Sequence, residues 1–300
     1  MCEYFDKPIS QNARGSGSMK YESLEIDGVL YNLVEIEKYG VNFELLIIVD
    51  TKSINGNLLK FISNRKIKAV TISFEQEKDL VCLKDAAFKQ VEFLNLVGDV
   101  IEDINEVATL KNLISFSFQG VFLTPFDFSE LKKLKMLEIL YNHGKTNGIS
   151  KCEGLEHLRI YHYKSKTKSL EEFSSLTNLK SLNFRQSHIN SLDGLKNLKS
   201  LYSLDLCYLR NLQNISALNN NESIVSLTIQ YAKKISDWGA IGTMKNLKGL
   251  LVHSCGIVKN LDFLKGLNNL EHLRFTDTKF EEDVKWIFDA EEFKNTKIIL

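Results

Sequence analysis

The chain has 300 residues, of which 44% are hydrophobic and 25% charged, a composition typical of a globular protein with a sizeable core. Lysine plus arginine and aspartate plus glutamate both number 38, so net charge does not favour nucleic acid or a membrane surface as a partner. No apolar run is long enough to cross a bilayer, and the N-terminus lacks the pattern of a secretory signal.

The cysteines are odd in number and scattered along the chain, and no two of them form a C-x-x-C pair. This pattern predicts free thiols in a reducing compartment, and we expect the protein in the cytoplasm. The cysteines are Cys2, Cys82, Cys152, Cys207 and Cys255.

Residues 1–18 do not share the pattern of the rest of the chain. They end in Gly-Ser-Gly-Ser directly before Met19, which predicts a tag or linker, with a natural flexible tail as the alternative. Residues 19–300 are predicted to form a single domain. Its N-terminal cap is expected over 19–40, with a hairpin-like turn at Asp27-Gly28.

From Tyr21 onward, one template recurs: an apolar residue, two residues, an apolar residue, one residue and an apolar residue. It is clear in Leu179-x-x-Leu182-x-Phe184, and it returns at intervals of 21 to 24 residues over about twelve units. Random apolar runs would not keep this phase, so the period indicates a repeat architecture. The expected starting residues are Tyr21, Phe43, Ile67, Val91, Leu113, Leu134, Leu155, Leu179, Leu201, Ile224, Leu247 and Leu270.

Each unit predicts a short strand followed by a helical return. The fourth and sixth template positions alternate along a strand, so both side chains point to one face. One strand cannot bury these side chains alone, but stacked units form a parallel sheet with a strand spacing of about 4.8 Å. The second half of a unit carries apolar residues at every third position, as at Ile235, Trp238 and Ile241. This spacing favours helical or 3₁₀ turns packed by one face.

These residues resemble the leucine-rich-repeat family in its short, 22-residue form, over residues 21 to about 292. The resemblance implies an α/β fold, a leucine-rich-repeat solenoid (horseshoe) with a parallel concave β-sheet and short helical or 3₁₀ convex returns. In that family the ninth position of a repeat is usually Asn or Cys. Here Asn142 and Cys255 fit, whereas other units carry residues such as Tyr163 or Ser187, so we expect uneven turns.

A C-terminal cap is predicted over residues 280–300, because a solenoid exposes its core at both ends. Val284, Trp286 and Ile287 lie among acidic residues and predict an amphipathic helix. Ile298-Ile299-Leu300 predicts a last strand that closes the core.

The sequence contains no recognisable catalytic or metal-binding motif. The run from His143 to Thr146 lacks the earlier glycine of a phosphate-binding loop, because that place is taken by Ile139 of a repeat strand. No cysteine or carboxylate completes a metal set with His157 and His162 at a recognisable spacing. We expect no catalysis and no cofactor. The alternative is an enzyme, or a small-molecule or metal binder, that uses histidines and cysteines of the central strands.

Outward-facing side chains of the same phase should form columns across the sheet. On this face the units beginning at Leu134 through Ile224 carry a patch of aromatic and arginine residues, which are enriched at binding hot spots. The alternative is that the tyrosines stack on one another and stabilise the sheet. The candidate partner-binding residues are Tyr141, Arg159, Tyr161, His162, Arg185, Asp205, Tyr208 and Tyr231.

These patterns predict a non-catalytic module that binds a partner protein through its concave face, as a scaffold, inhibitor or regulatory subunit. The alternative is a bacterial effector or toxin-neutralising immunity protein with the same binding mode. A composition rich in Lys, Asn and Ile and poor in Pro indicates an AT-rich genome, often bacterial or protozoan, and these two roles apply if the source is bacterial. Membranes and small molecules are not expected partners, and the balanced charge disfavours nucleic acid.

Overall fold

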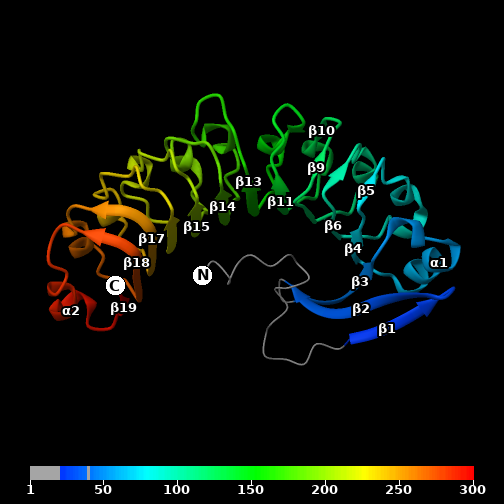
Figure 1. Cartoon of the computed structure of the whole chain (residues 1–300), viewed down its shortest axis with the longest axis horizontal. Helices are drawn as coiled ribbons and strands as arrows, with labels where there is room; N and C mark the ends of the chain where they lie inside the picture. Colours follow the sequence, from blue (N-terminus) through cyan, green and yellow to red (C-terminus); the bar gives the residue numbers. More distant parts are fainter. Residues whose placement is uncertain (1–20, 39–40) are drawn as a thin grey trace. The chain divides into compact units, whose positions relative to one another are not determined.

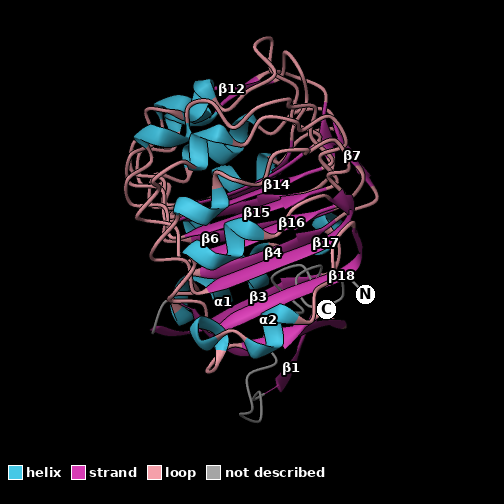
Figure 2. Ribbon diagram, turned by 90° about the vertical axis from the view of Figure 1, so that its left-hand side faces the viewer, coloured by secondary structure: helices cyan, strands magenta, loops and turns pink. Residues whose placement is uncertain are grey.

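A computed structural model describes residues 21–38 and 41–300. These residues divide into two compact units: unit 1 runs to Phe126 and includes Glu130–Leu134, and unit 2 comprises Asp127–Ser129 and Lys135–Leu300. In each unit the strands lie side by side, with helical turns on one side of the strand layer (Figures 1 and 2). The predicted tag or linker lies outside the described residues, and the single domain over 19–300 stays a prediction.

Unit 1 begins with an antiparallel hairpin. β1 and β2 are joined at Asp27 and Gly28, whose φ angles of 53° and 76° are the left-handed values of a two-residue hairpin turn. β2 pairs antiparallel with β3, and from β3 onward the neighbours in this sheet are parallel. The strands of the sheet are β1 (Tyr21–Ile26), β2 (Val29–Lys38), β3 (Val41–Ile48), β4 (Ala69–Ser73), β6 (Phe93–Val97) and β8 (Ser115–Phe118). A second, smaller sheet contains β5 (Gln76–Glu77), β7 (Val100–Ile101) and β9 (Val121–Phe122).

The predicted first repeat at Tyr21 is wrong. The turn at Asp27-Gly28 reverses the chain, so β1 runs antiparallel and its Tyr21 side chain is 64% exposed. The repeating register begins instead at β3, where Leu46 and Ile48 lie beside Val70 and Ile72 of β4.

Unit 2 carries the repeat in one register. The predicted fourth-position residues pair in sequence, from Leu137 of the first strand to Leu273 and then Ile298 at the C-terminal end. Its strands in this sheet are β11 (Met136–Leu140), β13 (His157–Tyr161), β14 (Ser181–Arg185), β15 (Ser203–Cys207), β16 (Ser226–Gln230), β17 (Gly249–Val258), β18 (His272–Phe280) and β19 (Lys297–Ile299). Two further short strands are β10 (Phe126–Asp127) and β12 (Thr146–Asn147).

Most returns are single 3₁₀ turns, as the three-residue apolar spacing predicted. They are Thr51–Ser53, Val81–Lys84, Ala86–Phe88, Asn105–Thr109, Phe128–Glu130, Ile149–Lys151, Glu171–Phe173, Leu195–Asn197, Ser216–Leu218, Ile241–Thr243, Asp262–Gly266 and Glu291–Phe293. The α-helices of the described residues are α1 (Gly56–Arg65) and α2 (Trp286–Asp289). α2 is one turn, far shorter than the predicted amphipathic helix, because Ala290 is already extended on the way to β19.

The core of each unit is a ladder of buried template residues. Leu204 and Leu206 of β15 are 1% and 0% exposed, and apolar residues of the returns, such as Leu195, are equally buried. Asparagines at the ends of several returns link their repeat to the one before it. For example, Nδ2 of Asn178 donates to the carbonyl oxygen of Glu153 over 2.9 Å, and Asn112, Asn246 and Asn269 make the same kind of bond.

The turns at the ninth position are held by several kinds of side chain. The Ser187 hydroxyl accepts from the backbone N–H of Tyr163 over 3.1 Å, and the Thr278 hydroxyl accepts from that of Cys255 over 3.4 Å. Hydroxyls thus satisfy backbone donors that the family's asparagine would satisfy. Tyr163 itself is fully buried at its ninth position, which accounts for part of the departure from the family pattern.

Candidate functional site

The candidate site lies on the open face of unit 2, which is the face of its sheet opposite the buried leucine ladder. The strand register confirms the predicted columns on this face. Between the buried pair, Glu138 lies beside Arg159, and Asn183 lies beside Asp205. One step along the strands, Tyr161 lies beside Arg185, and Gln230 lies beside His253.

Glu138, Arg159 and Tyr161 form a polar cluster on β11 and β13. Oε1 of Glu138 is 3.3 Å from Nη1 of Arg159 and accepts a hydrogen bond from the Tyr161 hydroxyl over 3.2 Å. Burial raises the pKa of Tyr161 to about 12, and the nearby Glu138 carboxylate adds to this shift. The hydroxyl therefore stays protonated and acts as a donor at neutral pH.

The next two strands continue the polar surface. Nδ2 of Asn183 donates to Oδ2 of Asp205 over 2.8 Å, which ties β14 to β15. The Arg185 side chain lies beside this pair on β14 and is buried, 7% exposed. Arg185 lies next to Tyr161 of β13. Arg159 and Arg185 are therefore on adjacent strands.

A second cluster lies at the carboxyl ends of β15 to β17. The rings of Tyr208 and Tyr231 stack with centroids 4.1 Å apart and an angle of 4° between their planes. The Tyr231 ring meets His253 edge-on at 4.9 Å, and its hydroxyl lies 3.0 Å from Nε2 of that histidine. Nδ1 of His253 contacts the Thr276 hydroxyl at 2.8 Å. This stack is the arrangement that the stabilising alternative predicted.

The tyrosines of the second cluster have an unusual backbone. His162, Gln186, Tyr208, Tyr231 and Ser254 all have φ between 51° and 57°, the left-handed region that disfavours side chains with a Cβ. The backbone N–H of each of the first four donates to a carbonyl of the next strand, as Tyr208 does to Gln230 over 2.9 Å. These interstrand hydrogen bonds thus hold the residues in one shared backbone conformation, so their side chains leave the strands in the same direction.

Tyr141 is separated from both clusters by its contacts with the core. Its ring meets the buried Tyr163 edge-on at 5.0 Å, and the Tyr163 hydroxyl donates to Glu172 over 2.7 Å. Burial raises the pKa of Tyr141. His162 is exposed, and its side chain makes no hydrogen bond or ring contact with the described residues.

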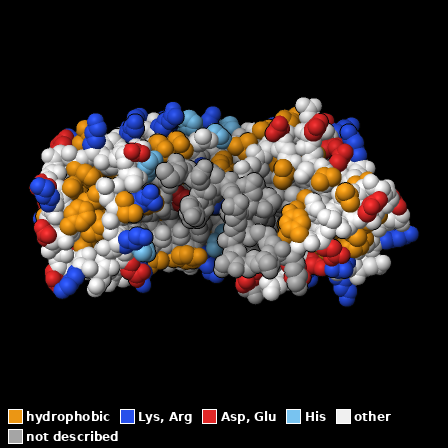
Figure 3. All heavy atoms as spheres, turned by 60° about the horizontal axis from the view of Figure 1, so that its bottom comes forward, with side chains coloured by type: hydrophobic (Ala, Val, Ile, Leu, Met, Phe, Trp, Pro, Cys, Tyr) orange, Lys and Arg blue, Asp and Glu red, His pale blue; other side chains and the backbone are white. Residues whose placement is uncertain are grey.

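Figure 3 shows, toward the C-terminal end, hydrophobic side chains with charged side chains of both signs and His around them. The sequence matches no protein-family model and no curated protein. Many solved structures are similar in fold, and three of them serve as examples. An internalin of Listeria monocytogenes has a TM-score of 0.53 and 20% identity, with 79% of this chain and 74% of that chain covered. A repeat protein of Leptospira interrogans has a TM-score of 0.56 and 17% identity, with 84% and 70% covered.

The third is a chain of the Drosophila Toll–Spatzle complex, with a TM-score of 0.56 and 13% identity, where 92% of this chain matches 46% of that one. The Leptospira protein is described as a leucine-rich-repeat protein, and the register above repeats at the same short interval. The protein has the leucine-rich-repeat fold. The α/β solenoid predicted from the template is therefore confirmed.

The leucine-rich-repeat sheet does not assemble all the predicted site residues into one patch. It groups Arg159 and Tyr161 on β13, with Arg185 beside Tyr161 on the adjacent strand β14, and it stacks Tyr208 on Tyr231. Glu138, His253 and Thr276 were not among the predicted site residues, although all three occupy positions in the predicted columns. Their contacts were missed because the order of residues in a column does not show which side chains are long enough to meet a neighbour on the next strand.

The histidines and cysteines of unit 2 were the alternative site that the sequence offered. Within residues 21–38 and 41–300, no group of histidine, cysteine and carboxylate side chains could hold a metal ion. Burial raises the pKa of Cys255 to about 11, and its thiol donates to the carbonyl oxygens of Ile229 and His253. A thiol of this kind is a poor nucleophile at neutral pH. No helix among the described residues has the length and apolarity to cross a membrane.

Proposed function

We propose that this leucine-rich-repeat protein binds a partner protein through the open face of unit 2 and performs no catalysis there. The observation that carries the proposal is the Tyr208–Tyr231–His253 array, in which rings and hydrogen-bonding groups are held together at the strand ends. Rigid aromatic side chains give contact area at low entropic cost on binding. The neighbouring arginines and Glu138 would supply charged contacts around that array.

The proposed role is that of a scaffold, inhibitor or regulatory subunit, and the cytoplasm is the proposed compartment. The latter rests on Cys82 and Cys255, which are free thiols in the structure. The Toll–Spatzle complex supports the binding mode only as a protein–protein complex that contains a chain of the same fold. An effector or immunity role would use the same surface, and the identity of the captured partner would distinguish these roles.

The test begins with affinity capture from lysate of the native cell and identification of the partner by mass spectrometry. The binding constant of the purified partner is then measured for wild-type protein and for Tyr208→Ala/Tyr231→Ala. We expect the double variant to lose at least about 2 kcal/mol of binding free energy, roughly thirtyfold in affinity. Its thermal melting temperature should change little, because each ring keeps part of its surface in solvent.

Tyr202→Ala is the matched control, since Tyr202 is an exposed tyrosine (45%) just before the opposite end of β15. The control should bind as tightly as wild type. If the double variant instead lost several degrees of thermal stability and bound normally, the stack would be a structural feature of the sheet. The proposal would then fail.

A further inference from the structure

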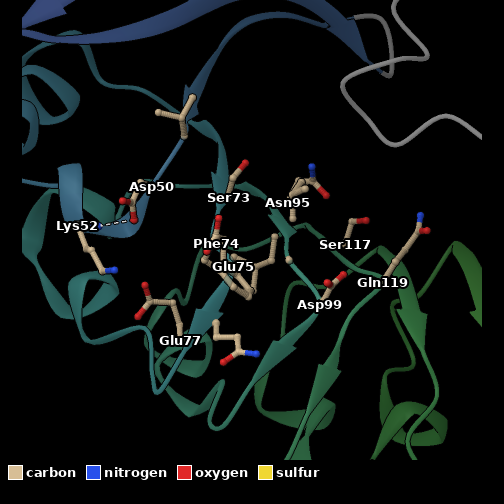
Figure 4. A pocket seen from close by; sticks show the side chains of 15 residues that line it. Asp50, Lys52, Ser73, Phe74, Glu75, Glu77, Asn95, Asp99, Ser117 and Gln119 are labelled. Atoms are coloured by element: carbon tan, nitrogen blue, oxygen red, sulfur yellow. Dashed lines mark hydrogen bonds between the residues drawn. The ribbon is translucent and has the colours of Figure 1, made fainter.

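Unit 1 contains a groove of about 1040 Å³ that the sequence did not predict (Figure 4). It lies at the carboxyl ends of the parallel strands, where Ser73 ends β4, Val97 ends β6 and Gln119 follows β8. The carboxyl ends of parallel strands meet at one edge of a sheet, so residues from several repeats line the same hollow. All the lining residues belong to unit 1.

Small side chains keep the groove open. Ser73, Gly98 and Ser117 come from three successive repeats and contribute little volume. Gly98 also lets the Phe74 ring lie close to the backbone, because a Cβ at position 98 would meet that ring and come within 2.7 Å of the Phe74 carbonyl oxygen. The hollow therefore results from the small residues at these positions and from the close packing of the Phe74 ring against Gly98.

The groove has an excess of negative charge. Asp50, Glu75, Glu77 and Asp99 line it, with Lys52 as the cationic residue among its described lining. Two of these carboxylates have structural partners, since Asp50 accepts from the backbone N–H of Lys52 and Glu77 accepts from the Thr51 hydroxyl. The other two, Glu75 and Asp99, make no ion pair or side-chain hydrogen bond within the described residues.

Strand pairing places the backbones of these two residues side by side. Gln76 pairs with Val100 in the β5–β7 ladder, so Glu75 and Asp99 are the preceding neighbours, about 4.8 Å apart along the sheet. Like charges in this position repel each other. Both residues are exposed, and a cation bound between them would relieve the repulsion.

A buried hydroxyl in the groove provides a second, independent indication of a ligand. Ser117 is 3% exposed and lines the groove, yet its hydroxyl makes no hydrogen bond within the described residues. The neighbouring Asn95, 4% exposed, donates to Thr71 over 3.4 Å. The Ser117 hydroxyl oxygen is not among the fully buried unpartnered atoms of the described residues, so it can be reached from the groove and is available to a ligand there.

We propose that this groove binds an arginine-containing segment of a partner polypeptide. The guanidinium group carries a permanent charge and five donors, which suits a groove lined by two unpaired carboxylates and an unpartnered hydroxyl. The site lies in unit 1, contains none of the residues of the open face of unit 2 and stands independently of the function proposed above.

The probe is a fluorescein-labelled peptide with two arginines flanked by glycines, and the reference peptide carries neutral citrulline in place of both arginines. Binding to the full chain is followed by fluorescence anisotropy. Glu75→Gln/Asp99→Asn removes the charge pair, and Ser117→Val removes the hydroxyl while the net charge stays the same. Glu281→Gln/Asp289→Asn is the matched control, because it removes two exposed carboxylates of unit 2.

We expect saturable binding of the arginine peptide, weakened at least about tenfold by Glu75→Gln/Asp99→Asn, less than about twofold by the control, and measurably by Ser117→Val. The citrulline peptide should bind as weakly as the arginine peptide binds the groove variant. Equal losses in the groove and control variants would reveal general charge attraction and overturn the proposal. Binding of calcium ions without measurable binding of the arginine peptide would also overturn the proposal. Circular dichroism checks that each variant is folded. If Ser117→Val is not folded, the test rests on Glu75→Gln/Asp99→Asn alone.

Discussion

At the scale of single residues, the most informative feature is the left-handed backbone at the ends of the unit 2 strands. Glycine or asparagine normally occupies such positions, whereas here they are filled by tyrosine and histidine at Tyr208, Tyr231 and His162. An L-residue in this region costs roughly 1 kcal/mol or more. That cost is offset by the interstrand hydrogen bonds that the backbone N–H groups of these residues donate.

Replacing Tyr208 by two small residues separates the backbone from the ring. Tyr208→Ala and Tyr208→Gly both lose the stack on Tyr231, but glycine also relieves the left-handed strain. We therefore expect Tyr208→Gly to be more stable than Tyr208→Ala by about 1 kcal/mol in urea unfolding. Gln213, an exposed residue without a positive φ, is the control site, where the glycine variant should not be the more stable of the two. Equal stabilities at position 208 would contradict the strain argument.

Glu156 gives unit 2 a measurable pH dependence. It lies between Lys180 and Lys135 at 2.6 and 2.9 Å, and hydrogen bonds from these two lysines lower its pKa to about 2. A carboxyl whose folded pKa is lowered stabilises the fold above its unfolded pKa, and this contribution disappears as the pH falls from about 4.5 to 2. We expect Glu156→Gln to lose about 1 kcal/mol at pH 7, because the lysines are about half exposed.

The measurement is the unfolding free energy of wild type and Glu156→Gln from pH 7 to pH 2. The difference between them should be constant above about pH 5, shrink below it and become smaller at high salt. Glu222→Gln, at an exposed glutamate, should show no such trend. A difference that persists unchanged at pH 2 would exclude the ion-pair explanation.

At the scale of elements, the template predicted the strands and the side-chain columns. Every second side chain of a strand must be buried, and only one register of parallel pairing buries the apolar ones on all strands together. The same reasoning failed at Tyr21. The turn at Asp27-Gly28 reverses the chain, so β1 pairs antiparallel with β2 although its apolar pattern matches the template. It also missed the burial of Tyr163, whose hydroxyl donates to Glu172, a contact with no local sequence signal.

The candidate site was predictable only in part, for related reasons. Column order followed from the repeat and placed Arg159, Tyr161 and Arg185 correctly. The stack of Tyr208 on Tyr231 depends on the left-handed φ of both residues, and tyrosine does not signal that conformation in a sequence. The unit 1 groove depends on the position of the Phe74 ring over Gly98, which only the packed structure provides.

Gly98 tests how tightly the first repeats are packed. A methyl group there would meet the Phe74 ring and backbone, and so Gly98→Ala should destabilise unit 1 by about 1–3 kcal/mol. Gly56 is the matched control, because a Cβ at this first residue of α1 has no heavy atom within 4 Å. Gly56→Ala should be neutral or slightly stabilising. Thermal melts of both variants decide the matter, and a Gly98→Ala variant as stable as wild type would contradict the packing argument.

At the scale of the whole molecule, the chain is a solenoid whose repeats contact mainly their sequence neighbours, and it divides into two compact units. Stability in such proteins is approximately a sum of repeat and nearest-neighbour contributions. A core substitution should therefore weaken its own unit first. The open face of unit 2 and the groove of unit 1 would then respond separately to damage in either core.

Leu206 and Leu96 allow this to be measured, because they occupy the same template position in β15 of unit 2 and β6 of unit 1 and are at most 2% exposed. Each change to alanine should cost about 2–5 kcal/mol. Hydrogen exchange followed by mass spectrometry should show that Leu206→Ala accelerates exchange most in β14 to β16 and least in β4 and β6. Leu96→Ala should give the reverse pattern. Uniform acceleration along the chain in both variants would mean that the two units unfold as one cooperative body, because only global opening exposes distant amides equally.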